Sequence, residues 1–233
     1  MKTFTIVTKW LFILCLPLML AVTSIGGTVN SSWLYQYGFK KYNVSQTTQL
    51  NEAELEKAAN GLINYFNSNE EYINLTVMKD GKPFMLFNER EIIHLKDVKW
   101  LIRLDYWVLL GTLLYALGYA GVSLWRKGYR QLASGAVWGS GLTLALMLVL
   151  GVGTLVNFNQ LFLQFHLLSF TNELWQLDPS QDYLIMLFPR GFWYDTTLLC
   201  ALATAAGAII LGGAGGFYLL FGKKGLYSNA AHT

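Results

Sequence analysis

The chain has 233 residues, of which 54% are hydrophobic and only 13% are charged, and its mean hydropathy is +0.36. Soluble domains carry about 25% charged residues, so this composition excludes intrinsic disorder and argues against a soluble domain. It is typical of a membrane protein that crosses the bilayer several times and has one modest part in water. The net charge of +3 comes without a basic, aromatic-rich stripe, so we expect no nucleic-acid partner.

Four apolar stretches are long enough, the first only just, to cross a bilayer as helices, which takes about 20 residues. They cover residues 10–26, 106–125, 132–156 and 196–221. The first stretch also fits a secretory signal peptide, although Ala21-Val22-Thr23 is a poor cleavage site. We therefore predict a mainly α membrane protein with four transmembrane helices and a small α+β extracytoplasmic cap.

The distribution of charge predicts the orientation of these helices. In three segments every charged residue is basic: the N-terminal flank, the loop at 126–131 and the tail after residue 221. All 14 acidic residues lie elsewhere. Since basic flanks stay in the cytoplasm, we expect a multi-pass protein of the cell membrane with both termini cytoplasmic. The predicted parts are a first transmembrane helix (1–27), the extracytoplasmic cap (28–105), the second and third transmembrane helices with a cytoplasmic loop (106–156), an aromatic-rich extracytoplasmic segment (157–195), and a fourth transmembrane helix with a cytoplasmic tail (196–233).

The cap is predicted to contain a helix, a β-hairpin and a second helix. Residues 51–67 place apolar side chains at helical spacing, and glutamates crowd the first turns. Asp80-Gly81, between two apolar runs, is typical of a hairpin turn. Asn88 with Glu91 three residues later is typical of a helix N-terminus, and the helix that follows runs toward the second apolar stretch.

Two histidines outside the apolar stretches are the candidate reactive residues. His94 lies on the second cap helix and shares one face with Arg90, Glu91 and Asp97, although a solvated helix face would look the same. His166 lies in the aromatic-rich segment after the third stretch. Because the pKa of histidine is near 6.5, a pair of neutral imidazoles can act as acid and base at neutral pH.

Other chemistries have less support in the sequence. It contains no HExxH, GxSxG or phosphate-binding loop, and no charge at the bilayer centre that would indicate a transporter. Cys15 and Cys200 fall inside apolar stretches, which is typical of buried small hydrophobes, with an acylated thiol as the alternative. The glycines at 212–216 indicate close helix packing. His94, Asp97 and His166 could supply three ligands to zinc, which leaves a zinc-dependent lipid hydrolase open.

Two longer motifs resemble one protein family. FNEREIIHLKDVK, followed across a two-span hairpin by FLQFHLLSFTNELWQLDPSQDYLIMLFPRGFWYD, is similar to the lipoprotein intramolecular transacylase (Lit) family of low-GC Gram-positive bacteria. The resemblance implies an enzyme that moves the sn-2 acyl chain of a diacylglyceryl-modified N-terminal cysteine to the α-amino group of that cysteine. The product is a lyso-form lipoprotein. The resemblance implies that His94 and His166 are catalytic, with the active site at the outer membrane face.

The resemblance also implies partners and supporting residues. It implies no cofactor and no metal, a diacylated lipoprotein substrate, contact with membrane lipids and, we expect, a monomer. Arg90, Glu91 and Asp97 are expected to orient His94. The residues expected to bind the substrate are Phe165, Asn172, Trp175, Asp178, Phe188, Trp193 and Tyr194. The alternative to an enzyme is a membrane receptor or accessory protein that binds through the cap.

Overall fold

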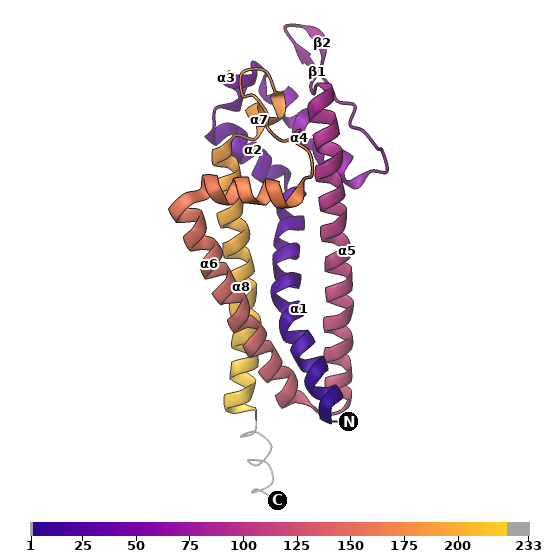
Figure 1. Cartoon of the computed structure of the whole chain (residues 1–233), viewed down its shortest axis with the longest axis vertical. Coiled ribbons are helices and arrows are strands. Elements are labelled where there is room, and N and C mark those ends of the chain that lie inside the picture. Colours follow the sequence, from indigo (N-terminus) through magenta and orange to yellow (C-terminus); the bar gives the residue numbers. More distant parts are fainter. Residues whose placement is uncertain (1, 223–233) are drawn as a thin grey trace, which may run out of the picture. The chain divides into compact units, whose positions relative to one another are not determined.

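The computed structural model describes residues 2–222 and is mainly helical (Figure 1). Lys223 and Lys224, which entered the orientation prediction, lie outside the described residues. The elements are α1 (Lys2–Val29), α2 (Ser32–Lys41), α3 (Val44–Thr48), α4 (Glu52–Asn67), β1 (Thr76–Lys79), β2 (Lys82–Met85), α5 (Glu89–Trp125), α6 (Tyr129–Ser169), α7 (Tyr183–Leu187) and α8 (Arg190–Phe221).

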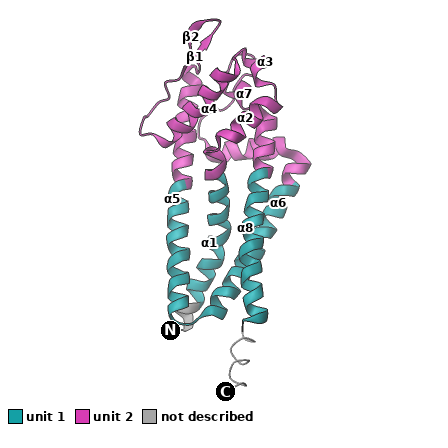
Figure 2. Cartoon of the chain, turned by 180° about the vertical axis from the view of Figure 1, so that it is seen from behind, with its two compact units in different colours: residues 1–25, 106–152, 199–233 teal, residues 26–105, 153–198 magenta. Residues whose placement is uncertain are grey.

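The chain divides into two compact units (Figure 2). Unit 1 comprises residues 1–25, 106–152 and 199–233, and unit 2 comprises residues 26–105 and 153–198. Helices α1, α5, α6 and α8 contribute residues to both units. The two segments that we expect outside the cytoplasm, 28–105 and 157–195, both fall within unit 2.

The four long helices have the length and composition to cross a membrane. They are α1 from Ile6, α5, α6 and α8, and each contains an apolar window in which only 17% to 22% of the residues are buried. The other residues of these windows are at least partly exposed, as is expected of apolar helices that face hydrocarbon. The prediction of four membrane-crossing helices is confirmed, and the chain is a multi-pass membrane protein.

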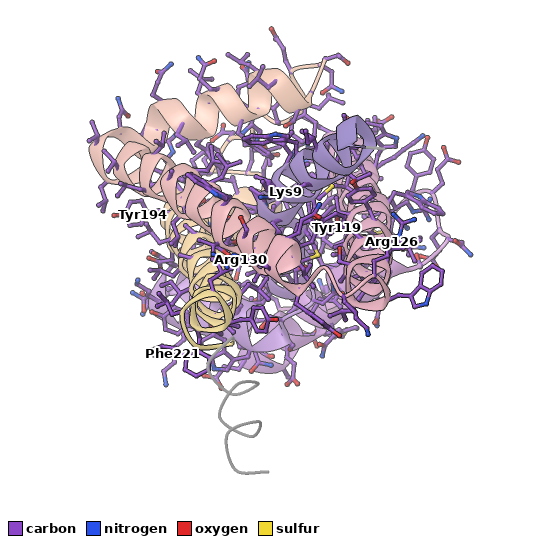
Figure 3. The ribbon with its side chains drawn as sticks, turned by 90° about the horizontal axis from the view of Figure 1, so that it is seen from below. Lys9, Tyr119, Arg126, Arg130, Tyr194 and Phe221 are labelled. Carbon is purple, nitrogen blue, oxygen red and sulfur yellow. The ribbon has the colours of Figure 1, made fainter. Side chains whose placement is uncertain are left out.

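Unit 1 packs through rings and small residues. Phe12 of α1 stacks on Tyr119 of α5, the residue labelled in Figure 3, with the ring centroids 4.6 Å apart. Lys9 Nζ donates to Ser134 Oγ of α6 at 2.9 Å. A Cβ atom added to Gly215 of α8 would lie 2.8 Å from the carbonyl oxygen of Ala133, which confirms that this glycine-rich stretch packs closely.

The cap elements in unit 2 form where the sequence predicts them. Asn51 Oδ1 accepts from Glu54 N at 3.0 Å and caps α4. Strands β1 and β2 pair antiparallel around Asp80 (φ 52°) and Gly81 (φ 73°), and positive φ at both positions fits a tight hairpin turn. The strands are shorter than the predicted apolar runs. Helices α2, α3 and α7 were not predicted.

Helix α6 is two helices joined at a break. Asn157 has φ −155° and ψ 78°, which is not helical, and the chain changes direction there (Figure 1). Asn157 Oδ1 accepts from Gln160 N at 3.1 Å and so caps the second part, residues 158–169. The break follows directly after the end of the third apolar stretch, and the second part of α6 carries His166.

Candidate active site

His94 is held in α5 by a well-capped helix start. Asn88 Oδ1 accepts from Glu91 N at 3.0 Å while Glu91 Oε2 accepts from Asn88 N at 2.8 Å, so the predicted capping box is confirmed. His94 follows one turn later and is only 6% exposed. Its Nδ1 atom is buried and has no hydrogen-bond partner among residues 2–222. A buried polar nitrogen without a partner lowers the stability of the fold, and a bound molecule could supply the missing hydrogen bond. Nδ1 of His94 is therefore a candidate to contact a substrate.

His166 is buried in the second part of α6 and its tautomer follows from its contacts. The side chain is 7% exposed, and its Nδ1 atom lies 2.8 Å from the carbonyl oxygen of Phe162. A carbonyl oxygen can only accept, so the proton of the neutral ring sits on Nδ1. The lone pair is then on Nε2, which is the atom that can take a proton from a substrate.

The two histidines meet inside an aromatic enclosure in unit 2. Their ring centroids lie 6.4 Å apart with 29° between the planes. Phe170 contacts both, at 5.0 Å from His94 and 5.5 Å from His166. Phe162 and Trp175 lie 4.3 Å and 4.9 Å from His166. The sequence thus brings two titratable rings from distant positions into one apolar site.

This burial keeps both imidazoles neutral. Desolvation, and secondarily the charge of His166, lowers the pKa of His94 to about 4, although Asp97 opposes the shift. Desolvation also lowers the pKa of His166, and the bond to the Phe162 carbonyl opposes that shift. Both rings are therefore uncharged at neutral pH and able to accept or donate a proton.

None of the residues expected to orient His94 hydrogen-bonds to it among the described residues. Arg90 donates to the carbonyl oxygen of Glu173 at 2.9 Å, and Asp97 Oδ2 accepts from Asn172 Nδ2 at 2.8 Å. Both bonds tie α5 to the loop that follows α6. The two side chains act on His94 only through their charges, since Asp97 raises its pKa and Arg90 lowers it.

Glu91 is a buried clamp between α5 and α7. It is 1% exposed, and its Oε1 accepts from Leu184 N of α7 at 2.6 Å. Burial raises the pKa of the Glu91 carboxyl group, although the hydrogen bonds from Leu184 N and Asn88 N oppose the shift. Asp182, just before α7, accepts from Asn88 Nδ2 at 2.7 Å through Oδ1. The loop and α7 are thus tied to the start of α5 at several points around His94.

The expected substrate-binding residues divide into two groups. Phe165 and Trp175 contact His166, with Phe165 at 5.2 Å and half exposed. Phe188 instead packs on Tyr35 of α2 at 5.2 Å. The other four have their described contacts with residues other than the histidines: Asn172 Nδ2 donates to Asp97 Oδ2, Asp178 Oδ1 accepts from Ser180 N in a local turn, Trp193 lies 6.3 Å from Phe162, and Tyr194 packs on Phe158 at 5.5 Å.

Sequence reasoning missed Phe162 and Phe170 as members of the site. They stand four residues before and four residues after His166, which is helical spacing and was the available signal. It also missed Asn88 and Asp182 as a link between segments, and no local pattern reveals that link.

A polar pocket opens beside the turn that carries His94. Its volume is about 530 Å³, and Ile93, the neighbour of His94, is part of its wall. The other residues around it are Asn88, Glu89, Arg90, Leu174, Asp178, Gln181 and Asp182. Among residues 2–222 no three His, Cys, Asp or Glu side chains gather as metal ligands, and Asp97 is engaged by Asn172.

Comparison with known proteins identifies the family. The family model described as lipoprotein intramolecular transacylase Lit matches residues 10–193, which is more than half of the chain. The chain belongs to the Lit family. The resemblance noted in the sequence is therefore confirmed, and the chain is a membrane member of a lipoprotein transacylase family.

Solved structures of Lit from Bacillus cereus share the fold. One aligns with a TM-score of 0.84 over 96% of this chain and 99% of that chain at 21% identity. A variant of that protein with a histidine-to-alanine substitution aligns with a TM-score of 0.76 over 96% of each chain, also at 21% identity. At this identity the likeness establishes the fold alone.

A relative known by sequence is an uncharacterized protein of Aquifex aeolicus (strain VF5). It is 32% identical over 155 residues, which is 66% of this chain. The match spans 65% of the length of that relative.

Proposed function

We propose that the chain transfers an acyl group within a bacterial lipoprotein, from the sn-2 position of the diacylglyceryl group to the α-amino group of the modified cysteine. The observation that carries the proposal is the buried pair of His94 and His166, with ring centroids 6.4 Å apart in an aromatic enclosure. Membership of the Lit family supports the substrate class. A lipoprotein delivers both reacting groups to one site.

His166 acts as the general base in this reaction. Its Nδ1 proton is held by the Phe162 carbonyl oxygen, so Nε2 faces the reaction with its lone pair. The α-amino group, with a pKa near 7.7–8.0, first loses its extra proton to water. As the amine nitrogen attacks the ester carbonyl carbon, Nε2 takes the second proton.

His94 acts as the electrophile. Because burial lowers its pKa to about 4, it is a neutral ring that can donate one N–H to the oxygen on which negative charge develops. The ester C–O bond then breaks, and the protonated His166 returns its proton to the glyceryl oxygen. One amide bond has formed, one ester bond has broken, and both histidines are again neutral.

Positioning contributes the rest of the catalysis. Attack by the amine closes an eight-membered ring, which is improbable in a freely moving lipid. Rings around His166, Phe162 at 4.3 Å and Trp175 at 4.9 Å, limit the conformations that the bound lipid can adopt. Donor and acceptor belong to one molecule, so the transfer uses neither an enzyme nucleophile nor a cofactor.

The membrane orientation belongs to the same proposal. All 14 acidic residues lie in unit 2, whereas Arg126, Lys127 and Arg130 lie in unit 1. Basic residues favour the cytoplasmic side, so both termini are cytoplasmic and the histidine pair is at the outer face.

The test is mass spectrometry of a reporter lipoprotein co-expressed with this chain in a host that leaves lipoproteins diacylated. The lipid mass does not change, so fragmentation must locate the acyl chain. We expect it on the cysteine nitrogen with the unaltered chain, and a loss of at least about 100-fold with His94→Ala or His166→Ala.

Leu168→Ala is the matched control, because Leu168 lies on the same helical segment as His166 and is 86% exposed. It should retain product formation. If both acyl chains stay on the glyceryl group when the unaltered chain is well expressed, the chain is a receptor or accessory protein instead. Release of free fatty acid that chelation of metal prevents would indicate the zinc-dependent hydrolase.

A further inference from the structure

Helix α2 is fixed at both ends to points where apolar helices end. At its start, Tyr35 Oη donates to the carbonyl oxygen of Val29, the last residue of α1, at 2.9 Å. At its end, Lys41 Nζ and Tyr42 Oη both bond Asp195 Oδ2 at 2.6 Å. Asp195 directly precedes the fourth apolar stretch. Helix α2 therefore lies at the level where two membrane-crossing helices leave the hydrocarbon.

One face of α2 is locked against the rest of unit 2. Leu34, Tyr35, Gly38 and Phe39 are buried. A Cβ atom on Gly38 would lie 2.4 Å from the ring of Phe192, so α2 and the start of α8 are in close contact. This contact fixes the rotation of α2 about its axis, and with it the residues on the opposite face.

The opposite face combines exposed aromatic rings with lysines. Trp33 is 68% exposed and Tyr37 is 44% exposed, and their rings stack with centroids 5.6 Å apart. Lys40 and Lys41 follow in the last turn, and α2 contains no acidic residue. Rings that are apolar with a polar edge, next to lysines, are the side chains that suit the headgroup layer of a bilayer.

The neighbouring helix α4 has the opposite surface. It packs against α2, where Ser32 Oγ bonds Asn60 Oδ1 at 3.4 Å. Its aromatic residues, Tyr65 and Phe66, are buried, while Glu52 and Glu56 are exposed. An anionic surface would therefore attract the exposed face of α2 and repel that of α4.

We propose that α2 is an interfacial helix whose exposed face binds the phospholipid headgroups of the leaflet nearest unit 2. Trp33 and Tyr37 insert among the headgroups, and Lys40 binds their phosphates. The contact sets the depth of unit 2 in the membrane surface, independently of the reaction that the histidines perform.

The test measures the depth of single spin labels on the full chain in nanodiscs that contain phosphatidylglycerol and phosphatidylcholine. Labels replace Trp33→Cys or Tyr37→Cys in a background with Cys15→Ala and Cys200→Ala. Depth comes from the ratio of accessibility to oxygen and to a water-soluble nickel complex. We expect both labels between about 15 and 22 Å from the bilayer centre, the range of the headgroup layer.

Two positions calibrate the measurement. Ala53→Cys, on the exposed side of α4, should report water. Leu114→Cys, which is 61% exposed in the apolar part of α5, should report hydrocarbon. Labels at 33 and 37 that match Ala53→Cys, that match Leu114→Cys, or that neither reagent reaches would each overturn the proposal, the last by indicating a protein partner.

A matched pair of lysine variants tests the role of charge. Replacing phosphatidylglycerol by phosphatidylcholine should move the label at position 33 toward water, and Lys40→Gln should reduce that movement. Lys57→Gln on α4 is the control and should leave the movement unchanged. A label that stays at one depth in both lipids would contradict binding of anionic headgroups through lysine.

Discussion

Unit 1 and unit 2 share four helices but bury different kinds of side chain. Unit 1 has no acidic residue, and a typical buried polar group is Thr143, whose Oγ1 bonds the Gly139 carbonyl oxygen of its own helix at 2.8 Å. Unit 2 holds all 14 acidic residues and buries charged groups such as Glu91 and Lys99. Close contact between helices stabilises a protein in hydrocarbon, whereas ionisable groups can be buried where they have partners, as in unit 2.

Buried charged groups in unit 2 have several partners each. In unit 2 the buried Lys99 Nζ bonds Ser68 Oγ and the Glu70 carbonyl oxygen, and it lies 4.0 Å from the Tyr65 ring centroid. Such bonds hold the backbone around a site without help from the bilayer. Substitutions can therefore disturb the close helix contacts of unit 1 and the bonded charged groups of unit 2 separately.

Glu91→Ala should cause the largest loss of stability. It removes the buried carboxylate that accepts from two backbone N–H groups, those of the half-buried Leu184 and the exposed Asn88, and a hydrogen bond to a charged group contributes about 1.5–3 kcal/mol. We expect a loss of about 3 kcal/mol in the free energy of unfolding. Thermal unfolding in detergent measures it. The exposed neighbour variant Glu89→Ala should change the midpoint little, and equal midpoints for the two variants would contradict the clamp.

Gly215→Ala should disturb unit 1 by a steric mechanism instead. The added methyl group would lie 2.8 Å from the Ala133 carbonyl oxygen, a backbone atom that cannot rotate away. Overpacking of this kind costs about 2 kcal/mol. Gly213→Ala is the control, because no atom lies within 4 Å of its added Cβ. The same melting experiment should give a lower midpoint for Gly215→Ala than for Gly213→Ala, and equal midpoints would contradict the steric mechanism.

Acid should destabilise unit 2 through the buried histidines. The pKa of His94 is about 4 in the folded state and near 6.5 when unfolded, so between these values the unfolded state binds more protons. Stability is therefore complete above pH 6.5 and falls as the pH decreases toward 4. At pH 5.5 we expect a loss of about 1–2 kcal/mol from His94. Melting curves at pH 7.5 and 5.5 measure it, and His94→Gln should reduce the difference.

Asn172→Ala should have the smallest effect on stability. It removes two hydrogen bonds of a half-buried side chain, from Nδ2 to Asp97 Oδ2 and from Leu174 N to Oδ1, which together correspond to about 1 kcal/mol. We expect acyl transfer to decrease more than stability, because the loop after α6 also carries Trp175, which packs on His166. Gln164→Ala, at an exposed position on α6, is the control. Equal loss of activity in both variants would show that the bond has no positioning role.

Much of the fold could be predicted because its signals are local. Four apolar stretches mark the long helices, Asn88 with Glu91 marks the start of α5, and Asp80-Gly81 marks the hairpin turn. Each signal lies within a few residues. The short helices are harder to predict: α3 and α7 have five residues each, and α2, although Ser31 caps its start, has ten and is held by contacts such as that of Tyr35 with Phe188, which is distant in the sequence.

The site was predictable only in part for the same reason. The histidines are visible as residue types, and their distance from each other is not. Asp97 and Arg90 share a face with His94, which suggests contact, yet their hydrogen bonds go to Asn172 and to the Glu173 carbonyl oxygen. Spacing along a helix gives the direction of a side chain but does not identify the partner from another segment.

The bond from Leu184 N to Glu91 spans 93 positions of the sequence, so its two partners are synthesised at different times. Ribosomes add about 5–20 residues per second, so Glu91 emerges roughly 5–20 s before its partner. During that interval the chain holds His94 but not the loop and helix that enclose it. The newly made protein therefore gains its complete site only late in synthesis, when most of the polypeptide is already in the membrane.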